Sequence, residues 1–275
     1  SDAPPSKWLR PARFQFMAKE LETDKKSPET DADNVRAVDT GGRYALQYGE
    51  NERHGEGTGW IMFLIGICGA SGSGKTTLAD ELMRRLNTRA ILLHQDSYYR
   101  NHPDMSFEER RLINYDEPAA FDNDALYEDL RLLKAGKPIT EKQYDYTRHL
   151  RCDTGAPVEP ASTVIIEGIH VFYDPRVRDL LDLKLYIKVD PDICLLRRVQ
   201  RDIAERERRI DDIAQQYLST VKPMFEQYIR GYERDADIIV ARGGKSQRIA
   251  DALACYINNG GMAEEQGEQT APHDM

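Results

Sequence analysis

Residues 69–76 of the chain read Gly69-Ala70-Ser71-Gly72-Ser73-Gly74-Lys75-Thr76 and match the pattern G-x-x-x-x-G-K-[ST] at every fixed position. An apolar run at 61–68 precedes the motif, and a helix-forming stretch at 76–86 follows it. The glycines let backbone N–H groups turn toward one anion, and the helix N-terminus adds partial positive charge. The alternative, a glycine-rich turn that only joins a strand to a helix, is disfavoured because the motif and both flanks are complete. We therefore predict that residues 69–76, called the P-loop below, hold a nucleoside triphosphate together with Thr77.

The composition excludes several classes of protein. The 275 residues suffice for one large α/β domain or two small ones, and 40% hydrophobic with 31% charged residues is a globular balance. The run at 61–68 is far shorter than the roughly twenty residues that cross a bilayer, and we expect no signal peptide. A net charge of −9 disfavours general affinity for nucleic acid or anionic membranes. The four scattered cysteines form no C-x-x-C pair, which indicates reduced thiols and a cytoplasmic protein.

The middle of the chain alternates between strand-like and helical patterns. Residues 1–59 hold few aliphatic side chains and 260–275 are polar and acidic, so we expect both ends to be disordered around one domain at 60–259. Strands are predicted at 61–68, 90–94, 163–166, 184–189 and 237–240, and helices at 76–87, 122–135, 191–204, 210–230 and 246–258. Helices between short apolar strands predict an α/β fold, a parallel sheet of the P-loop type with helices on both faces.

Residues 138–158 interrupt this alternation. Their pattern predicts a β-hairpin that projects from the carboxyl edge of the sheet, where ligands of such folds bind. Tyr144, Tyr146 and His149 lie in it and could stack on a planar base. Cross-strand packing of the tyrosines is the alternative.

Two carboxylates directly follow predicted strands. Asp96 comes after 90–94, where a carboxylate can accept the proton of an attacking alcohol. Glu167 ends the run at 163–166 and is placed to hold Mg²⁺. An N-cap or turn role for Asp96, and a plain strand-end role for Glu167, are the alternatives.

Residues 197–209 carry six arginines in an acidic chain. In a helix, Arg198 and Arg201 share a face, and such a cluster can act as a lid that closes over phosphates. The alternative is a solvated helix in which Asp202, Glu205 and Glu207 make internal ion pairs.

From about Ile61 to Asn258 the sequence resembles the uridine–cytidine kinase family. The resemblance rests on the P-loop, on 95–99 (QDSYY), 114–118 (NYDEP), 120–123 (AFDN), 144–146 (YDY), 164–168 (VIIEG), 201–206 (RDIAER), 216–217 (QY), 221–224 (VKPM) and 236–240 (ADIIV). It implies Mg²⁺-dependent transfer of the γ-phosphate of ATP or GTP to the 5′-hydroxyl of uridine or cytidine, in a homo-oligomer that is commonly a tetramer.

The resemblance also implies roles for single residues. Asp96 would be the base toward the hydroxyl, and Asp116 and Arg198 would hold the ribose. The base site would be shaped by Tyr99, Tyr144, Tyr146, His149 and Gln216. The phosphates would be contacted by Lys75, Arg201, Arg206 and Arg208, and the metal would be surrounded by Thr76, Glu167 and Asp96.

Two departures from the family pattern are visible. Glu207 stands where the family usually has glycine, which could change lid closure. The stretches 167–170 (EGIH) and 174–181 resemble the phosphoribulokinase branch, which phosphorylates a sugar phosphate. The aromatic hairpin favours a nucleoside. A GTPase-like switch lacks its [NT]-K-x-D motif (187–190 read IKVD), and an RNA-binding protein is disfavoured by the acidic balance.

Overall fold

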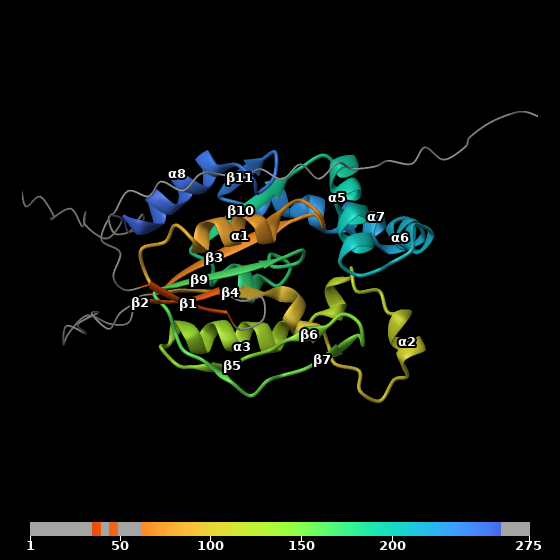
Figure 1. The fold of residues 1–275 in the computed structure, drawn as a ribbon, viewed down its shortest axis with the longest axis horizontal. Helices are drawn as coiled ribbons and strands as arrows, with labels where there is room; N and C mark the ends of the chain where they lie inside the picture. The colour runs from red at the N-terminus through yellow and green to blue at the C-terminus, as the bar shows by residue number, and fades with distance from the viewer. Residues whose placement is uncertain (1–34, 40–43, 49–61, 260–275) are drawn as a thin grey trace, which may run out of the picture. The chain divides into compact units, whose positions relative to one another are not determined.

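A computed structural model describes residues 35–39, 44–48 and 62–259 (Figure 1). Its central feature is a five-stranded sheet with the strand order β11-β10-β3-β9-β4, in which all neighbouring strands are parallel. The strands are β3 (Phe63–Gly69), β4 (Ala90–His94), β9 (Thr163–Gly168), β10 (Leu183–Lys188) and β11 (Ile238–Ala241). All six residues of β9 are buried, as expected for a strand covered on both faces. The predicted α/β fold is confirmed.

Helices cover both faces of this sheet. The longer ones are α1 (Lys75–Met83), α3 (Asn123–Lys134), α5 (Pro191–Ala204) and α8 (Gln247–Asn258). Alternate strand residues point to opposite faces, so Leu64 packs in a core with Leu130 of α3. Its neighbour Ile65 packs in the other core with Leu78 of α1 and Leu253 of α8. Figure 1 shows α1 and α8 on one side of the sheet and α3 on the other.

The predicted helix at 210–230 is divided in the structure. It comprises α6 (Ile210–Gln216), a π-helical turn (Tyr217–Val221), α7 (Lys222–Gln227) and a following 3₁₀ segment (Ile229–Asp235). Pro223 has no N–H to donate to the preceding turn, which gives a physical reason for the wider turn just before it. Four short helical segments among the described residues were not predicted: η1 (Gln95–Tyr98), α2 (Phe107–Arg111), η2 (Pro118–Ala120) and α4 (Pro175–Arg178).

The predicted hairpin at 138–158 is present. Two short antiparallel ladders form it, β5 (Ile139–Thr140) with β8 (Pro157–Val158) and β6 (Tyr144–Asp145) with β7 (Leu150–Arg151). At its tip the Asp145 carboxylate accepts the N–H groups of Thr147 (2.8 Å) and Arg148 (3.1 Å). These bonds fix the turn just before His149.

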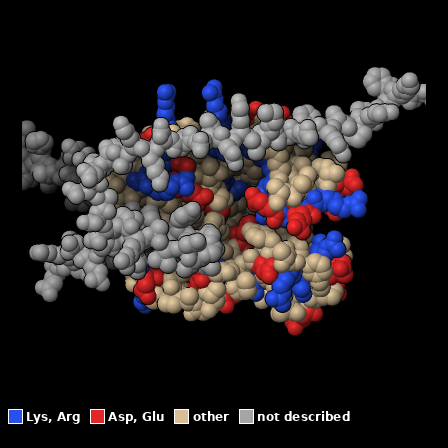
Figure 2. Space-filling model, in the orientation of Figure 1, with Lys and Arg blue, Asp and Glu red and all other residues tan. Residues whose placement is uncertain are grey.

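Two strands, β1 (Val35–Asp39) and β2 (Tyr44–Tyr48), pair antiparallel and fall within the stretch 1–59. The rest of that stretch and 260–275 lie outside the described residues, so disorder of both ends stays a prediction. Within the described part of the chain, no helix combines the length and apolar character needed to cross a membrane. On the face shown in Figure 2, acidic and basic side chains are interspersed over the described residues.

Candidate active site

The loop between β3 and α1 has the backbone that its glycines were expected to allow. Gly72 (φ 82°) and Gly74 (φ 99°) are left-handed. A Cβ at Gly72 would lie 2.4 Å from the carbonyl oxygen of Cys194, so the loop also packs too tightly there for a side chain. Lys75 is only 8% exposed, and its Nζ donates to the carbonyl of Ala70 at 3.1 Å. The lysine is therefore held over the loop.

Thr76 and Glu167 lie together, as the sequence indicated. The Thr76 hydroxyl donates to Glu167 Oε1 at 3.1 Å, and Nδ1 of His94 lies 2.8 Å from the same oxygen. Burial raises the pKa of Glu167, but the His94 hydrogen bond and the Lys75 charge outweigh burial and lower it. Burial in turn lowers the pKa of His94, and the bond to Glu167 outweighs this and raises it. Glu167 is thus held as a carboxylate, and sequence reasoning missed His94 as its partner.

Asp96 lies in η1, directly after β4. Its Oδ2 accepts the Tyr146 hydroxyl at 2.7 Å, and the Arg206 guanidinium lies 4.4 Å from the centre of the Tyr146 ring. Burial and the Asp96 charge raise the pKa of Tyr146, so this phenol stays protonated and donates. Tyr146 was predicted for the base site, and the structure instead places it on the predicted catalytic carboxylate. Among the described residues Asp96 makes no hydrogen bond to Thr76 or Glu167.

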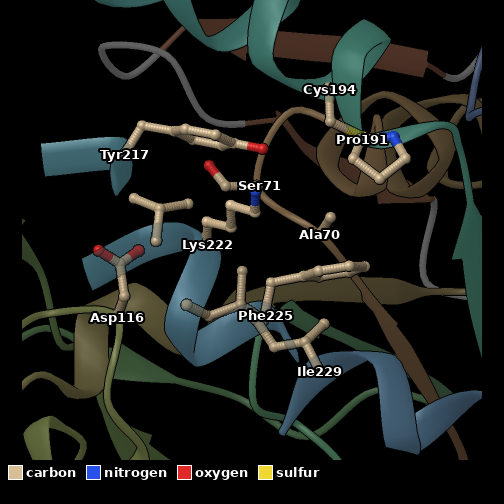
Figure 3. A pocket seen from close by; sticks show the side chains of 11 residues that line it. Ala70, Ser71, Asp116, Pro191, Cys194, Tyr217, Lys222, Phe225 and Ile229 are labelled. Carbon is tan, nitrogen blue, oxygen red and sulfur yellow. The ribbon is translucent and has the colours of Figure 1, made fainter. Parts of the chain in front are cut away.

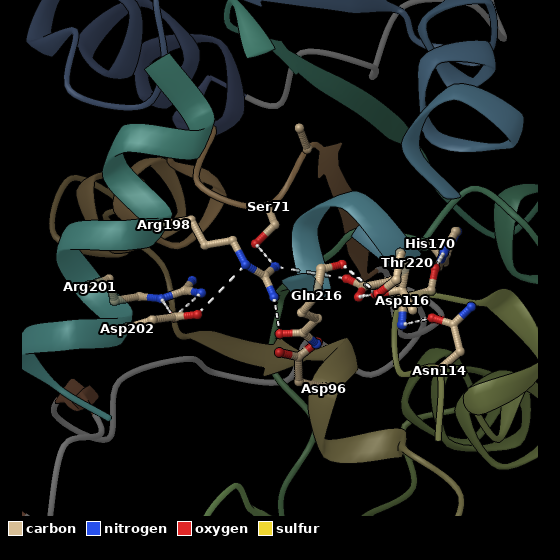
Figure 4. Close-up of polar contacts among 12 residues, drawn as sticks. Ser71, Asp96, Asn114, Asp116, His170, Arg198, Arg201, Asp202, Gln216 and Thr220 are labelled. Carbon is tan, nitrogen blue, oxygen red and sulfur yellow. Dashed lines mark hydrogen bonds and ion pairs between the residues drawn. The ribbon is translucent and has the colours of Figure 1, made fainter. Parts of the chain in front are cut away.

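Arg198 connects the P-loop to the predicted acceptor residues (Figure 4). It is 6% exposed and donates to the Ser71 hydroxyl (3.0 Å) and to Gln216 Oε1 (3.0 Å). Its Nη1 lies 3.9 Å from Oδ1 of Asp116, and the other carboxylate oxygen, Oδ2, accepts the Thr220 hydroxyl at 3.0 Å. Burial raises the pKa of Asp116 against the opposing effects of Arg198 and Thr220. Asp116 and Arg198 are therefore neighbours, as the resemblance implied. Gln216, which the resemblance assigned to the base site, also contacts Arg198, and Thr220 was missed.

The predicted lid arginines gather around one carboxylate. Asp202 is fully buried and accepts hydrogen bonds from Arg201 (2.8 Å) and Arg208 (3.3 Å), with Arg206 at 3.6 Å. Burial raises the pKa of Asp202, but the arginines outweigh burial and lower it. The alternative interpretation, in which Asp202 makes ion pairs on a solvated helix face, does not fit this buried carboxylate. Arg208, predicted at the phosphates, also donates to Gln216 Oε1 at 2.7 Å and so lies on the acceptor side.

Aromatic rings form a cluster beneath the hairpin. Tyr115 stacks on His149 with ring centres 5.2 Å apart and 18° between the planes. The ring centres of Tyr144 and Tyr99 are 4.8 Å apart, and the Tyr144 hydroxyl is 3.5 Å from Nδ1 of His149. Tyr99 is 7% exposed and packs on Phe121, so it supports the cluster from below. Burial and neighbouring arginines lower the pKa of His149, which keeps that ring neutral near pH 7.

Comparison with known proteins identifies the family. Residues 64–249 match the model of the phosphoribulokinase / uridine kinase family. The chain belongs to this family. Over 197 residues the chain is 48% identical to the uridine kinase of Latilactobacillus sakei. The matched region covers 71% of this chain and 93% of that protein. The uridine kinase of Limosilactobacillus reuteri is 45% identical over 197 residues, with 71% and 90% covered.

The solved structures agree with this at the level of the fold. A putative fructose transport system kinase from Silicibacter matches with a TM-score of 0.53 and 23% identity, covering 65% of this chain and 89% of that one. As a P-loop kinase fold, the chain is expected to use a nucleoside triphosphate.

A small pocket adjoins the P-loop of this chain (Figure 3). Ala70 and Ser71 form one side of the pocket, and the carboxylate of Asp116 lies at its margin. The other walls are formed by Ile169, Pro191, Cys194, Tyr217, Val221, Lys222, Phe225 and Ile229. Among the described residues, no three His, Cys, Asp or Glu side chains cluster to hold a metal ion.

Proposed function

We propose that the chain transfers the γ-phosphate of ATP or GTP to the 5′-hydroxyl of uridine or cytidine. The observation that carries the proposal is the link through Arg198, which bonds Ser71 of the phosphate loop and lies against Asp116. This link supports a triphosphate site next to an acceptor site, in which Asp116, together with Asp96, can bind hydroxyl groups. The relatives named uridine kinase, matched over 90% or more of their length, support the same acceptor.

The chemistry follows from which groups face each other. Asp96 accepts the proton of the 5′-hydroxyl as the oxygen attacks, and the Tyr146 hydroxyl holds the carboxylate in place through its bond to Oδ2. Asp116 and Arg198 bind the ribose hydroxyls. Lys75, with Arg201 and Arg206, spreads the charge of the transferring phosphoryl group.

Magnesium fits the oxygen donors present. Mg²⁺ is usually held in kinases by one or two carboxylates and by substrate phosphates, with the remaining positions filled by water. Thr76 and Glu167, with Asp96 nearby, would hold the ion, which neutralises phosphate charge when bound. Both His94 and Thr76 bond Oε1 of Glu167, and neither bonds Oε2.

The aromatic cluster supports a pyrimidine base as the acceptor's second half. Tyr144 and Tyr115 offer ring faces, and a neutral His149 presents one donor and one acceptor. Such a ring can pair with the carbonyl of uridine or the amino group of cytidine in the same position. Gln216, whose Oε1 accepts hydrogen bonds from Arg198 and Arg208, would hold the base on the side opposite His149.

The test is ADP or GDP release with Mg²⁺ and each triphosphate, with uridine, cytidine or ribulose 5-phosphate as acceptor. We expect stimulation by both nucleosides. Stimulation by ribulose 5-phosphate alone would overturn the proposal in favour of a sugar-phosphate kinase. That alternative rests on the stretches 167–170 and 174–181. Of the first stretch, His170 is 1% exposed and cannot contact an acceptor directly.

We further propose a homo-oligomer, a tetramer by resemblance, in the cytoplasm. Two exposed apolar side chains, Leu196 of α5 (58%) and Leu218 of the π-helical turn after α6 (67%), support an interface between copies. The four cysteines are all free, which suits a reducing compartment. Sedimentation equilibrium tests the assembly: a monomer at micromolar concentration would contradict it.

A further inference from the structure

His170 is a buried polar residue that the chemistry above does not use. It follows β9 and is 1% exposed. Its Nε2 lies 2.8 Å from the carbonyl oxygen of Asp116, and its Nδ1 lies 3.0 Å from the Tyr232 hydroxyl. A carbonyl can only accept, so Nε2 carries the proton and Nδ1 accepts from Tyr232. Burial lowers the pKa of His170 to about 4, which agrees with a neutral ring.

The backbone of His170 makes a second connection. Its N–H donates to Oε1 of Gln95 at 2.8 Å, and Gln95 is fully buried and directly precedes Asp96. Gly168 leaves space for this side chain, since a Cβ there would lie 2.3 Å from Gln95 Oε1. The φ angle of Gly168 is not left-handed. Glycine is therefore needed here to leave room for the Gln95 side chain and not to allow an unusual backbone conformation. One residue thus bonds both the segment of Asp96 and the segment of Asp116.

The other contacts of Asp116 are of a different kind. Its N–H donates to Asn114 Oδ1 at 3.1 Å, a bond within the same loop. Thr220 and Arg198 contact the carboxylate and not the backbone (Figure 4). Several described hydrogen bonds involve the backbone of residues 114–117. Of these, the bond from His170 is the one that comes from the segment directly after strand β9.

We propose that His170 is a positioning residue that sets the distance between Asp96 and Asp116, and with it the fit of the acceptor. The inference rests on the proposed function in one respect, that Asp96 and Asp116 bind the same acceptor molecule. Because the ring is buried, His170 acts through these two residues and touches no substrate. The 167–170 motif is then compatible with a nucleoside kinase.

Three variants of His170 separate positioning from general stability. His170→Gln places an amide N–H near the position of Nε2, His170→Asn is too short to reach Asp116, and His170→Leu has no donor. Losing a buried neutral hydrogen bond should raise the nucleoside KM about tenfold in the Asn and Leu variants, with the ATP KM and kcat within about threefold of the parent. The Gln variant should stay within about threefold on all three parameters. Leu253→Ala, in the opposite core, is the control that lowers stability without moving either KM.

A second measurement needs no substrate. Hydrogen exchange of the amides at 115–117 should be faster in His170→Asn than in His170→Gln, while exchange in β3 is equal in both. If the parent protein phosphorylates no nucleoside, the proposed function fails, and this exchange result still decides the role of His170. Equal exchange in the two variants, or equal rises of both KM values, overturns the inference. If His170→Leu does not fold, the Asn and Gln pair carries the test alone.

Discussion

Glu207 is the position where a single substitution should improve the protein. It lies between α5 and α6, is exposed, and has a left-handed backbone with φ 52°. Its side chain makes no hydrogen bond or ion pair among the described residues, so removing it loses no contact. A non-glycine residue in this conformation costs about 1–2 kcal/mol. Glycine removes that cost. Its greater conformational freedom in the unfolded chain, however, lowers the stability of the fold by about 0.4–1 kcal/mol.

The net expectation for Glu207→Gly is therefore about 0.5–1 kcal/mol of added stability, or a Tm higher by about 2–3 °C. Urea unfolding measures this, with Glu207→Ala as the matched control because it removes the carboxylate but keeps the Cβ. Both variants remove a negative charge between Arg206 and Arg208, so both should lower the ATP KM by about twofold. Only glycine should raise stability. A glycine variant no more stable than the alanine variant would refute the argument from backbone conformation.

Three further predictions follow from the site. Asp96→Asn should lower kcat at least about 100-fold with the ATP KM unchanged, and near-normal turnover in steady-state assays would exclude Asp96 as the base. Asp202→Asn should lower the free energy of unfolding, measured with urea, by about 2 kcal/mol. The loss is smaller than for a fully buried ion pair because Arg201 is 32% exposed. The control Glu205→Gln should leave the free energy of unfolding unchanged. Since the pKa of Asp202 is lowered in the fold, its contribution is present above about pH 4 and lost below it, so the Asn variant should show less acid loss. The folded-state pKa of His170, about 4 against 6.5, favours the neutral ring, so stability should fall by on the order of 3 kcal/mol from pH 6.5 to 4. His170→Gln should lack this fall, and parallel pH profiles for parent and variant would contradict the assignment.

The sheet could be predicted from the sequence because its signals are local. Each strand is a short apolar run, and the P-loop fixes the strand–loop–helix order around 69–76. Parallel strands end at one edge, so Asp96 and Glu167 had to lie on the same side as the loop. The hairpin at 138–158 was equally readable from its alternation and turns. In each case the deciding contacts are between near neighbours or follow from strand direction alone.

The site's partners could not be predicted because they join distant segments. Tyr146 meets Asp96 across 50 positions, and His94 meets Glu167 across 73. Nothing in the local sequence of a hairpin states which of its tyrosines turns toward a strand end. The burial of Asp202 could not be predicted for a related reason: an aspartate among arginines is usually on a solvated face, and only the packing of α5 shows it to be buried.

The buried carboxylate also explains how an acidic chain can attract a triphosphate. Four guanidinium groups, those of Arg198, Arg201, Arg206 and Arg208, lie within 4 Å of Asp202, and four positive charges less one leave a surplus of three. Counting Asp116 as ionised still leaves two. Arginine keeps its charge at any physiological pH, so this surplus is permanent. Asp202 orders the long side chains before phosphate arrives, and the net charge of −9 is spread elsewhere. Local arrangement, and not overall charge, therefore decides which anion this surface binds.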